Sequence, residues 1–531
     1  MALLVSDKKA SPDELRTRVD ELEDLLSGRD RLIAELKVII EGKEQKYAEL
    51  QKLIFGPKSE RIVSDDPKQG VLVFNEAERD SDQAPEDERV QTIRRRVGKR
   101  HGRKRPSPEF ERIEVLHDVP DTEKLCPCCG RERARIGEER SEEIEIIPAH
   151  VVVHEHVRPK YGPCSCDDFE LCGAKTVLIA PAPAKIAIGS LFSNHTAAFL
   201  LVGKYADGLP FYRQEKVIAR MGLSMSRGTM AHLAVRIGTA LGPIIDLVRR
   251  DIRGSPVMRM DETFVQVLKE PGKAPTSESR MWVAMGYREG RPVLLFVYND
   301  SRSGDVAEAI VGSGFEGFLQ TDGYSGYARI GKRTGIVHVG CWAHIRREFY
   351  ALFESEEKTP LAAAILEHIR ALYSIERRLR SDLNEGHLSI DEFTTKRKDQ
   401  TAEVFEKIRC WLHEHESVVP PQSSLGKAIT YALGQYNRAI RYVEHPLLTP
   451  DNNPVENAIR RFVIGRKAWL FCDTLRGAWA SATLYSIIET AKANGHEPYR
   501  YLCYLFDRLP LATTPAAIEA LLPYVLKPTE Y

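Results

Sequence analysis

The chain has 531 residues, of which 43% are hydrophobic and 29% are charged, so it is long enough to bury several cores and to hold more than one domain. It contains no run of about eighteen apolar residues, and its first ten residues lack the basic-then-apolar order of a secretory signal, so we expect an intracellular protein. Lys and Arg number 76, as do Asp and Glu, so a surface for nucleic acid requires local clustering of charge.

The first pattern along the chain is a heptad of apolar residues from Leu15 to Ile54, in which ten of the twelve seam positions are apolar. Ser11-Pro12 begins the helix and Gly56-Pro57 ends it. The pattern predicts a coiled coil over residues 11–56. Because the seam is narrow, we favour self-association over a single amphipathic helix that lies on its own protein.

Residues 57–108 form a predicted flexible linker with two blocks of opposite charge. An acidic block holds seven acids and one Arg, and a basic block that follows holds eight Lys or Arg and no acid. The end of the basic block resembles short hooks that lie in the minor groove of A·T-rich DNA. Arg103, Lys104 and Arg105 are therefore candidate DNA contacts, although a solvated basic tail explains the same composition equally well.

Six of the ten cysteines are concentrated in residues 109–185, which we interpret as a zinc-finger or zinc-ribbon domain. Two pairs of thiolates joined by a hairpin suit the tetrahedral site that Zn²⁺ prefers, and four thiolates make such a site structural. The predicted ligands are Cys126, Cys129, Cys164 and Cys166. The second pair has an unusually tight spacing, so Cys172, Cys128 or His156 could substitute.

Residues 186–250 predict a helical region that contains a helix, a short Gly-containing turn and a second helix. This is the layout of a helix-turn-helix, in which the second helix enters the major groove of DNA. Arg227 and Arg236 are the candidate groove contacts, with His232 between them. Many helical hairpins that bind no DNA share the layout, so the pattern leaves both interpretations open.

A run of predicted strands follows. Residues 256–268 predict a strand that contains Asp261 and Glu262, although Asp is disfavoured in strands and a buried carboxylate needs a cation or a donor. Residues 281–287 and 292–298, separated by a Gly-containing turn, predict a hairpin.

Three further segments carry candidate site residues. A short strand ends at Asp322, and a strand at residues 336–339 runs into a helix that carries the motif Cys341-x-x-His344. Much later, a helix with Pro near its start carries Glu456.

Three antiparallel strands, further parallel strands and an acid-bearing helix make a ribonuclease-H-like α/β layout. Such a fold brings Asp261, Asp322 and Glu456 to one edge of the sheet, where hard oxygen donors suit a pair of Mg²⁺ ions. The residues also have simpler interpretations. Asp322 could be a turn residue, Glu456 could belong to a capping box, and Glu262 could face the site in place of Asp261.

The predicted fold class is therefore multidomain α/β, with a ribonuclease-H-like core that holds an all-helical insertion. A coiled coil, a zinc ribbon and a helix-turn-helix-like region precede the core. From residue 251 onward we expect the first part of the core at 251–349, the helical insertion at 350–445, the core helix with the third acid at 446–480, and a C-terminal helical segment at 481–531.

Taken together, these motifs resemble the large transposase of the insertion sequence 66 family, a group of bacterial DDE transposases. The resemblance rests on segments spread over nearly the whole chain. They are Phe55-Gly56-Pro57-Lys58-Ser59-Glu60-Arg61, Cys126-Pro127-Cys128-Cys129-Gly130, Lys204-Tyr205 to Gln214, Asp261-Glu262-Thr263, Thr321-Asp322-Gly323-Tyr324, Cys341-Trp342-Ala343-His344, Asn453-Pro454-Val455-Glu456-Asn457 and Asn494-Gly495-His496-Glu497-Pro498.

The resemblance implies a catalytic triad of Asp261, Asp322 and Glu456 that binds Mg²⁺ or Mn²⁺. Cys341 and His344 resemble an element that many such transposases carry after the second acid, although their spacing could equally reflect packing. The chain departs from the family at the second zinc pair, where Cys-x-Cys stands in place of Cys-x-x-Cys. Four cations follow Glu456 in the sequence: Arg460, Arg461, Arg466 and Lys467. They are candidate contacts to the phosphates of the cut strand, although a solvated basic face explains them as well.

The resemblance implies a DNA transposase that cleaves the ends of an insertion sequence and transfers the strand into target DNA. Its expected partners are double-stranded DNA at terminal inverted repeats and at the target, a second copy of the chain through the coiled coil, and accessory proteins that elements of this family often encode. The expected location is the bacterial cytoplasm, with nucleoid association when bound to DNA. Two alternatives are an inactive DNA-binding regulator and a ribonuclease-H-like nuclease without strand transfer.

Overall fold

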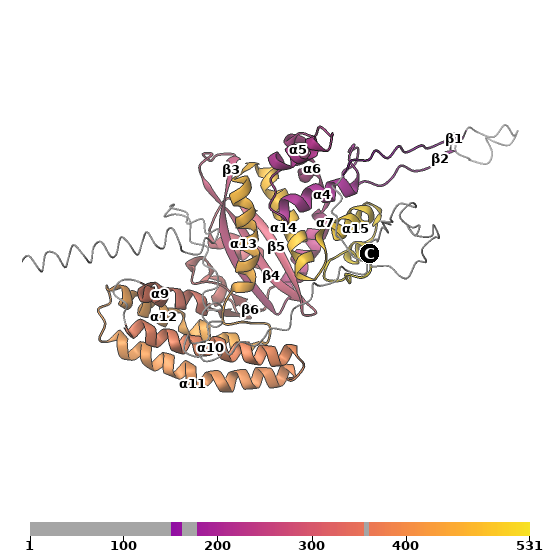
Figure 1. The fold of residues 1–531 in the computed structure, drawn as a ribbon. Coiled ribbons are helices and arrows are strands. Elements are labelled where there is room, and N and C mark those ends of the chain that lie inside the picture. Colours follow the sequence, from indigo (N-terminus) through magenta and orange to yellow (C-terminus); the bar gives the residue numbers. More distant parts are fainter. Residues whose placement is uncertain (1–149, 162–177, 355–359) are drawn as a thin grey trace, which may run out of the picture. The chain divides into compact units, whose positions relative to one another are not determined.

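The computed structural model of the chain describes residues 150–161, 178–354 and 360–531 (Figure 1). The predicted coiled coil and linker, with Arg103, Lys104 and Arg105, lie outside the described residues. The four predicted zinc ligands, Cys126, Cys129, Cys164 and Cys166, lie outside them as well. Next to that segment, β1 (Lys160–Tyr161) and β2 (Leu178–Ile179) pair antiparallel.

A mixed six-stranded sheet forms the centre of the described part. Its strand order is β5-β4-β3-β6-β7, in which β3, β4 and β5 are antiparallel, and β6 and β7 run parallel to β3 on its other side. The sixth strand, β8, pairs parallel with the end of β3. The strands are β3 (Val257–Lys269), β4 (Glu278–Arg288), β5 (Arg291–Asn299), β6 (Gly317–Gln320), β7 (Ile336–Val339) and β8 (Cys472–Thr474).

The predicted hairpin is confirmed as β4 and β5. Glu289 and Gly290 at its turn both have positive φ angles, 52° and 78°, which is the conformation that two-residue hairpins favour. The middle of β4 is buried on both faces, and for this reason its sequence is continuously apolar instead of alternating.

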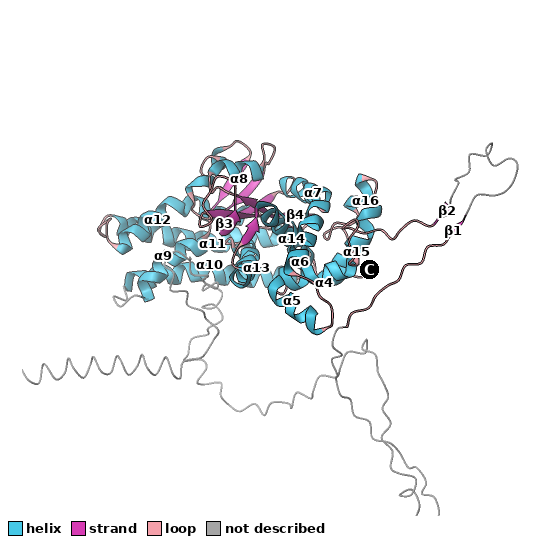
Figure 2. Cartoon of the chain, turned by 90° about the horizontal axis from the view of Figure 1, so that it is seen from above, coloured by secondary structure: helices cyan, strands magenta, loops and turns pink. Residues whose placement is uncertain are grey.

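Helices cover both faces of this sheet (Figures 1 and 2). On one face α13 and α14 pack on the strands, and Phe296 of β5 contacts Phe462 of α13 and Tyr485 of α14. On the other face, Trp282 of β4 packs edge-on against Tyr327 in the short helix η2, which in turn contacts α8. These elements are α8 (Gly304–Val311), η2 (Ser325–Tyr327), α13 (Asn453–Trp469) and α14 (Leu475–Ala493).

The predicted helix-turn-helix forms two helices of the expected order, α5 and α6. Both are preceded by α4 and followed by α7, and α6 packs tightly on α14, where a side chain at Gly238 would meet Ala480. α15 packs against α4 near the C-terminus. The elements are α4 (Asn194–Tyr205), α5 (Phe211–Arg220), α6 (Arg227–Ala240), α7 (Gly242–Arg253), α15 (Pro498–Arg508) and α16 (Pro515–Glu519).

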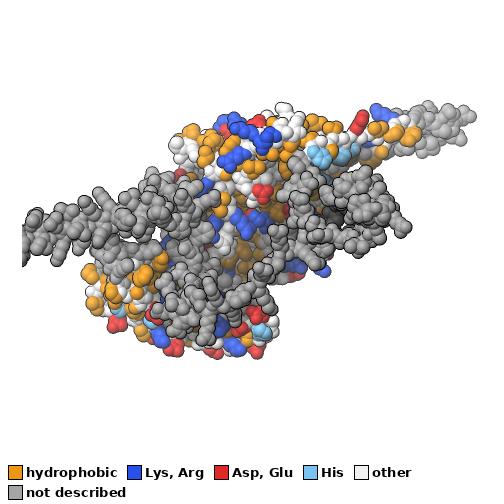
Figure 3. Space-filling view, in the orientation of Figure 1, with side chains coloured by type: hydrophobic (Ala, Val, Ile, Leu, Met, Phe, Trp, Pro, Cys, Tyr) orange, Lys and Arg blue, Asp and Glu red, His pale blue; other side chains and the backbone are white. Residues whose placement is uncertain are grey.

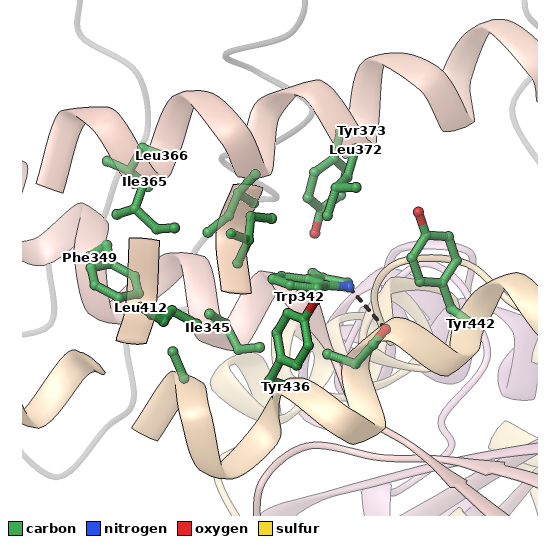
Figure 4. Packing of buried hydrophobic residues seen from close by; sticks show 14 of the residues in the cluster. Trp342, Ile345, Phe349, Ile365, Leu366, Leu372, Tyr373, Leu412, Tyr436 and Tyr442 are labelled. Carbon is green, nitrogen blue, oxygen red and sulfur yellow. Dashed lines mark hydrogen bonds between the residues drawn. The ribbon is translucent and has the colours of Figure 1, made fainter. Parts of the chain in front are cut away.

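The segment between β7 and α13 is helical, as the sequence predicts. It contains α9 (Trp342–Glu354), α10 (Pro360–Asn384), α11 (Ile390–Glu416), α12 (Ser424–Ala439) and η4 (Ile440–Glu444). Its core surrounds Trp342, whose indole N–H donates to the Ala439 carbonyl at 2.9 Å (Figure 4). Because Trp342 stands at the start of α9, this core also anchors the residues that follow β7.

The predicted boundary at residue 480, between the core-helix segment and the C-terminal segment, falls within α14, which crosses that position without a break. Ser486 and Thr490 of α14 bond the backbone of β5, so this helix belongs to the core and not to a separate C-terminal segment.

Among the described residues no single helix could cross a membrane; α6 and α7, which meet at 54°, pass the length and composition criteria only as a bent pair.

Candidate active site

The register of the parallel strands brings two of the predicted acids to one level of the sheet. Arg259 of β3 pairs with Gln320 of β6, which pairs with Val339 of β7. Two residues further along each strand direction stand Asp261, Asp322 and Cys341. Residues at one level of adjacent parallel strands are neighbours, and the carboxyl ends of such strands are where α/β proteins build their sites.

The third acid reaches the same place through α13. Asn452, which precedes the helix, donates its side-chain amide to the Met260 carbonyl at 2.9 Å and its backbone N–H to the Cys341 sulfur at 3.3 Å. Glu456 lies in the first turn of the helix. The side chain of Asn452 makes no capping bond to α13, so the capping-box interpretation of Glu456 is not realised.

Fully buried polar side chains hold the segment before α13 across the strand ends. Arg259 donates to the Leu447 carbonyl and Gln320 to the Thr449 carbonyl, each at 2.7 Å. The backbone N–H of Trp342 donates to the Pro450 carbonyl at 2.9 Å. These bonds fix the start of α13 relative to β3, β6 and β7, and each gives a partner to one nitrogen of the buried Arg259 and Gln320 side chains.

Burial raises the pKa values of all three acids, and the charges of neighbouring acids add to this effect at Asp261 and Glu456. Burial raises the pKa of Asp261 well above its usual range, and the charges of Glu456, Glu262 and Asp322 raise it further. Burial also raises the pKa of Asp322. Burial, with the charges of Asp451 and Asp322, raises the pKa of Glu456 to about 7, although Arg347 and Arg460 oppose this change. Close, buried carboxylates of this kind are stabilised in their ionised form by a cation.

Glu262 faces away from this cluster. It is opposite Trp282 in the β3–β4 pairing, whereas Asp261 is opposite Val283, so the pleat turns the two acids to different faces of the sheet. The Glu262 carboxylate accepts from Arg302 Nε at 2.6 Å and from the Tyr327 hydroxyl at 2.9 Å. Its acceptors are therefore engaged, and Asp261 is the acid that faces α13.

Cys341 and His344 join Glu456 in a second group. The donor atoms of the three side chains all lie within 4.8 Å of one another. His344 Nδ1 is 3.9 Å from Glu456 Oε1. Burial, with a contribution from the charge of Arg347, lowers the pKa of His344 to about 4, so its imidazole is neutral at physiological pH.

The donor set of the acid cluster fits divalent cations. Asp261 and Asp322 each accept one backbone N–H, from Glu262 and Tyr324, and the remaining carboxylate oxygens can bind a cation. Glu456 Oε1 is buried and has no hydrogen-bond partner. A buried acceptor without a donor is the kind of atom that a metal ion satisfies.

The predicted phosphate contacts on α13 differ in their surroundings. The predicted contact between Arg466 and a DNA strand is wrong. Arg466 is buried, donates to the Phe264 carbonyl and stacks on the Phe264 ring, so it cannot reach DNA. Arg461 is half exposed, but it is paired with the buried Glu489. Lys467 is exposed, and Arg460 is close enough to Glu456 for its charge to oppose the rise in the pKa of Glu456.

The predicted groove contacts lie on α6. Arg227 is exposed at the start of this helix, and Arg236 donates to the Ile188 carbonyl. Lys and Arg side chains also gather in the region of α5 on the face shown in Figure 3. Exposed cations of α5 are Arg213, Lys216 and Arg220.

Sequence reasoning missed several residues around the acids. Arg302 lies in the loop after β5, where no motif marks it, and it reaches Glu262 only because β3 and β5 flank β4. Asn452 and Tyr327 each stand within a few residues of a predicted acid, so their positions offered a signal. The charge of the exposed Arg347 of α9 opposes the rise in the pKa values of both Asp322 and Glu456.

The fold and the site thus define a mixed α/β protein with a buried carboxylate cluster suited to divalent cations. Residues 189–480, more than half of the chain, match the family described as Transposase IS66 family. Residues 486–524 match the IS66 C-terminal element. The chain belongs to the IS66 transposase family, and this membership supports a transposase role.

Two matches lie toward the N-terminus. Residues 123–167 match the zinc-finger binding domain of transposase IS66, a segment that includes all four predicted zinc ligands and excludes Cys172. Residues 44–115 match a region described as Transposase C of IS166 homeodomain, which covers the end of the predicted coiled coil and the whole predicted linker. A zinc finger suggests zinc binding, and both matches agree with the family resemblance of the sequence.

The chain is also similar to several uncharacterized proteins of Sinorhizobium fredii. It is 29% identical to y4jD over 485 residues, which cover 88% of this chain and 91% of that protein. It is 31% identical to y4qI over 430 residues, covering 78% of this chain and 76% of that protein. A third protein, y4hP, is 25% identical over 440 residues, with 79% and 76% covered.

Proposed function

We propose that this chain is a DDE transposase, in which Asp261, Asp322 and Glu456 would hold divalent cations where water attacks a phosphodiester at the end of an insertion sequence and releases a 3′ hydroxyl. The freed 3′ hydroxyl then attacks target DNA, without a covalent protein intermediate. The observation that carries the proposal is the convergence of three buried acids from β3, the end of β6 and the first turn of α13.

The sheet supports a ribonuclease-H-like core. Three antiparallel strands are followed by two parallel strands on the far side of the first strand, and an acid-bearing helix packs on that sheet. This is the layout that the strand pattern of the sequence predicts. The helical segment between β7 and α13 is compatible with a ribonuclease-H-like core. Hydrogen bonds from Arg259 and Gln320 hold the residues that follow this segment against the ends of β3 and β6.

Bound Mg²⁺ or Mn²⁺ would activate the attacking oxygen and stabilise the leaving oxygen of the phosphodiester. The residues of the chain hold the reactants in place. Asp261 is fixed on the central strand and Glu456 on a helix, so the ligands belong to rigid elements. Arg347, exposed beside Asp322 and Glu456, is suited to attract the phosphate that is cut.

The other regions supply DNA binding and assembly in this proposal. The α5–α6 hairpin, with Arg227 exposed at the start of its second helix, recognises the terminal inverted repeats together with the zinc finger and the basic tract. The coiled coil pairs two copies of the chain so that both ends are cut together.

The test is cleavage of DNA that carries both terminal repeats, taken from the sequence that flanks the gene. We expect Mg²⁺-dependent nicking by wild type and a loss of more than about 100-fold in Asp322→Asn. Asp305→Asn, a change of the same chemistry at an exposed position on α8, is the matched control and should cleave like wild type.

The same reactions separate the alternatives. Nicking without joined products would indicate a nuclease without strand transfer. Specific binding without nicking in wild type would indicate an inactive regulator. Equal nicking by wild type and Asp322→Asn would refute the assignment of the acids.

A further inference from the structure

A thiol, an imidazole and a carboxylate meet beside the acid cluster. Cys341 follows β7, His344 stands one turn later on α9, and Glu456 comes from α13. Their donor atoms lie within 4.8 Å of one another. Cys341 immediately precedes α9, and its carbonyl accepts the backbone N–H of Ile345 at 3.5 Å, so the short spacing places Cys341 and His344 at the same end of this helix.

Two of these donor atoms are left without a partner. His344 Nδ1 and Glu456 Oε1 are both buried and make no hydrogen bond, although they are 3.9 Å apart. A buried polar atom without a partner is costly, and two such atoms that face each other are explained by a group that fits between them. A cation satisfies a carboxylate oxygen and a neutral imidazole nitrogen at the same time.

The kind of cation follows from the ligands. Mg²⁺ prefers six oxygen ligands, whereas a thiolate and an imidazole favour softer ions such as Zn²⁺. With Zn–S and Zn–N bonds of about 2.3 and 2.0 Å, ligand atoms around tetrahedral zinc are roughly 3.4 to 3.7 Å apart. Side-chain movements of about 1 Å would therefore close the site.

The protein already supports one of these ligands. The Cys341 sulfur accepts the backbone N–H of Asn452 at 3.3 Å, an interaction typical of metal-binding thiolates. Asn452 is itself tied to β3 through the Met260 carbonyl. The sulfur and the start of α13 are thus held together before any ion binds.

We propose that Cys341, His344 and Glu456 form a second metal site, selective for a soft divalent cation such as Zn²⁺, which inhibits DNA cleavage by taking Glu456 from the catalytic cations. Three protein ligands leave the fourth position to water. The binding part of this proposal stands on the three side chains alone. The inhibitory part rests on the proposed function, because it requires Glu456 to serve the cleavage reaction.

Binding is tested on the full-length chain with zinc titration and with Co²⁺ as a spectroscopic probe of thiolate ligation. The predicted zinc finger adds the same number of bound Zn²⁺ ions and the same Co²⁺ absorption to every variant. The test therefore compares each variant with wild type. We expect Cys341→Ser to bind one Zn²⁺ fewer than wild type and to lose part of the thiolate-to-Co²⁺ absorption. Cys472→Ser, which changes a buried free cysteine on β8, should match wild type.

A second variant, His344→Gln, tests the site even if Cys341→Ser does not fold. His344→Gln retains the thiol and should also bind one Zn²⁺ fewer, with wild-type circular dichroism. Wild-type zinc stoichiometry in both variants would overturn the proposed site.

Inhibition is tested by adding Zn²⁺ to the Mg²⁺-dependent cleavage reaction. The zinc concentration for half inhibition, relative to the zinc-free rate of each variant, should rise at least about tenfold in Cys341→Ser and stay unchanged in Cys472→Ser. Equal inhibition of both variants would overturn the inhibitory role even if binding is found. If wild type cleaves no DNA, the proposed function fails, while the zinc stoichiometry still decides the site.

Discussion

Ionisation of Glu456 gives the metal-free protein a stability that depends on pH. Burial and Asp451 raise the pKa of Glu456 from 4.5 to about 7. Each pKa unit corresponds to about 1.4 kcal/mol, so this difference is about 3 kcal/mol. A raised pKa means that the folded state binds the proton more tightly than the unfolded state. The stabilisation is therefore complete below the unfolded pKa and is lost as the pH rises through about 7.

The substitution Glu456→Gln removes the titrating proton and keeps the shape of the side chain. In EDTA, the free energy of unfolding of wild type minus that of Glu456→Gln should fall by about 3 kcal/mol between about pH 4 and about pH 9. Urea unfolding followed by circular dichroism at a series of pH values measures this difference. Excess Mg²⁺ should reduce the pH dependence of wild type, because a cation stabilises the ionised carboxylate.

An exposed glutamate provides a control of opposite sign. Glu403 on α11 bonds Lys407 Nζ at 2.7 Å, and this hydrogen bond lowers its pKa. Its contribution is present above the ordinary pKa and is lost as the pH falls, so the difference between wild type and Glu403→Gln should run in the other direction. A wild-type minus Glu456→Gln difference that is constant with pH would refute the reasoning about the buried cluster.

Three further substitutions test local features of the fold. A side chain at Gly323 would lie 2.6 Å from the Tyr431 hydroxyl, so Gly323→Ala should slow DNA cleavage without unfolding the protein, and adding Tyr431→Phe should restore part of the rate; no rescue would contradict this contact. Leu470 is exposed with a φ of 68°, so Leu470→Gly should raise the free energy of unfolding in urea by roughly 1 kcal/mol, and a loss of stability would contradict the strain. Trp342→Phe leaves the buried Ala439 carbonyl without its donor and should cost about 2 kcal/mol in the same assay, whereas a neutral effect would contradict the packing in Figure 4.

The sequence determined the elements whose signals are local. Alternation, turn residues and helical periodicity predict β3, the β4–β5 hairpin, the α5–α6 pair and the helical character of the insertion. They succeed because each depends on neighbours a few residues away. The short strand β8 and the true extent of α14 were missed, because both are defined by contacts with β3 and β5.

Only the tertiary structure decided how the candidate site is assembled. A strand pattern allows either Asp261 or Glu262 to face α13, and the pairing of β3 with β4, together with the bonds from Arg302 and Tyr327, makes the choice. Arg466 shows the same limit, since a cation in a polar helix looks exposed until Phe264 of another element covers it.

The Cys341, His344 and Glu456 group illustrates the physical reason. Cys341 stands 111 positions before Asn452, and a whole helical insertion separates them. No sequence spacing specifies that proximity. It arises because buried hydrogen bonds from Arg259, Gln320 and Asn452 return the chain to the strand ends, and those bonds exist only once the sheet has formed.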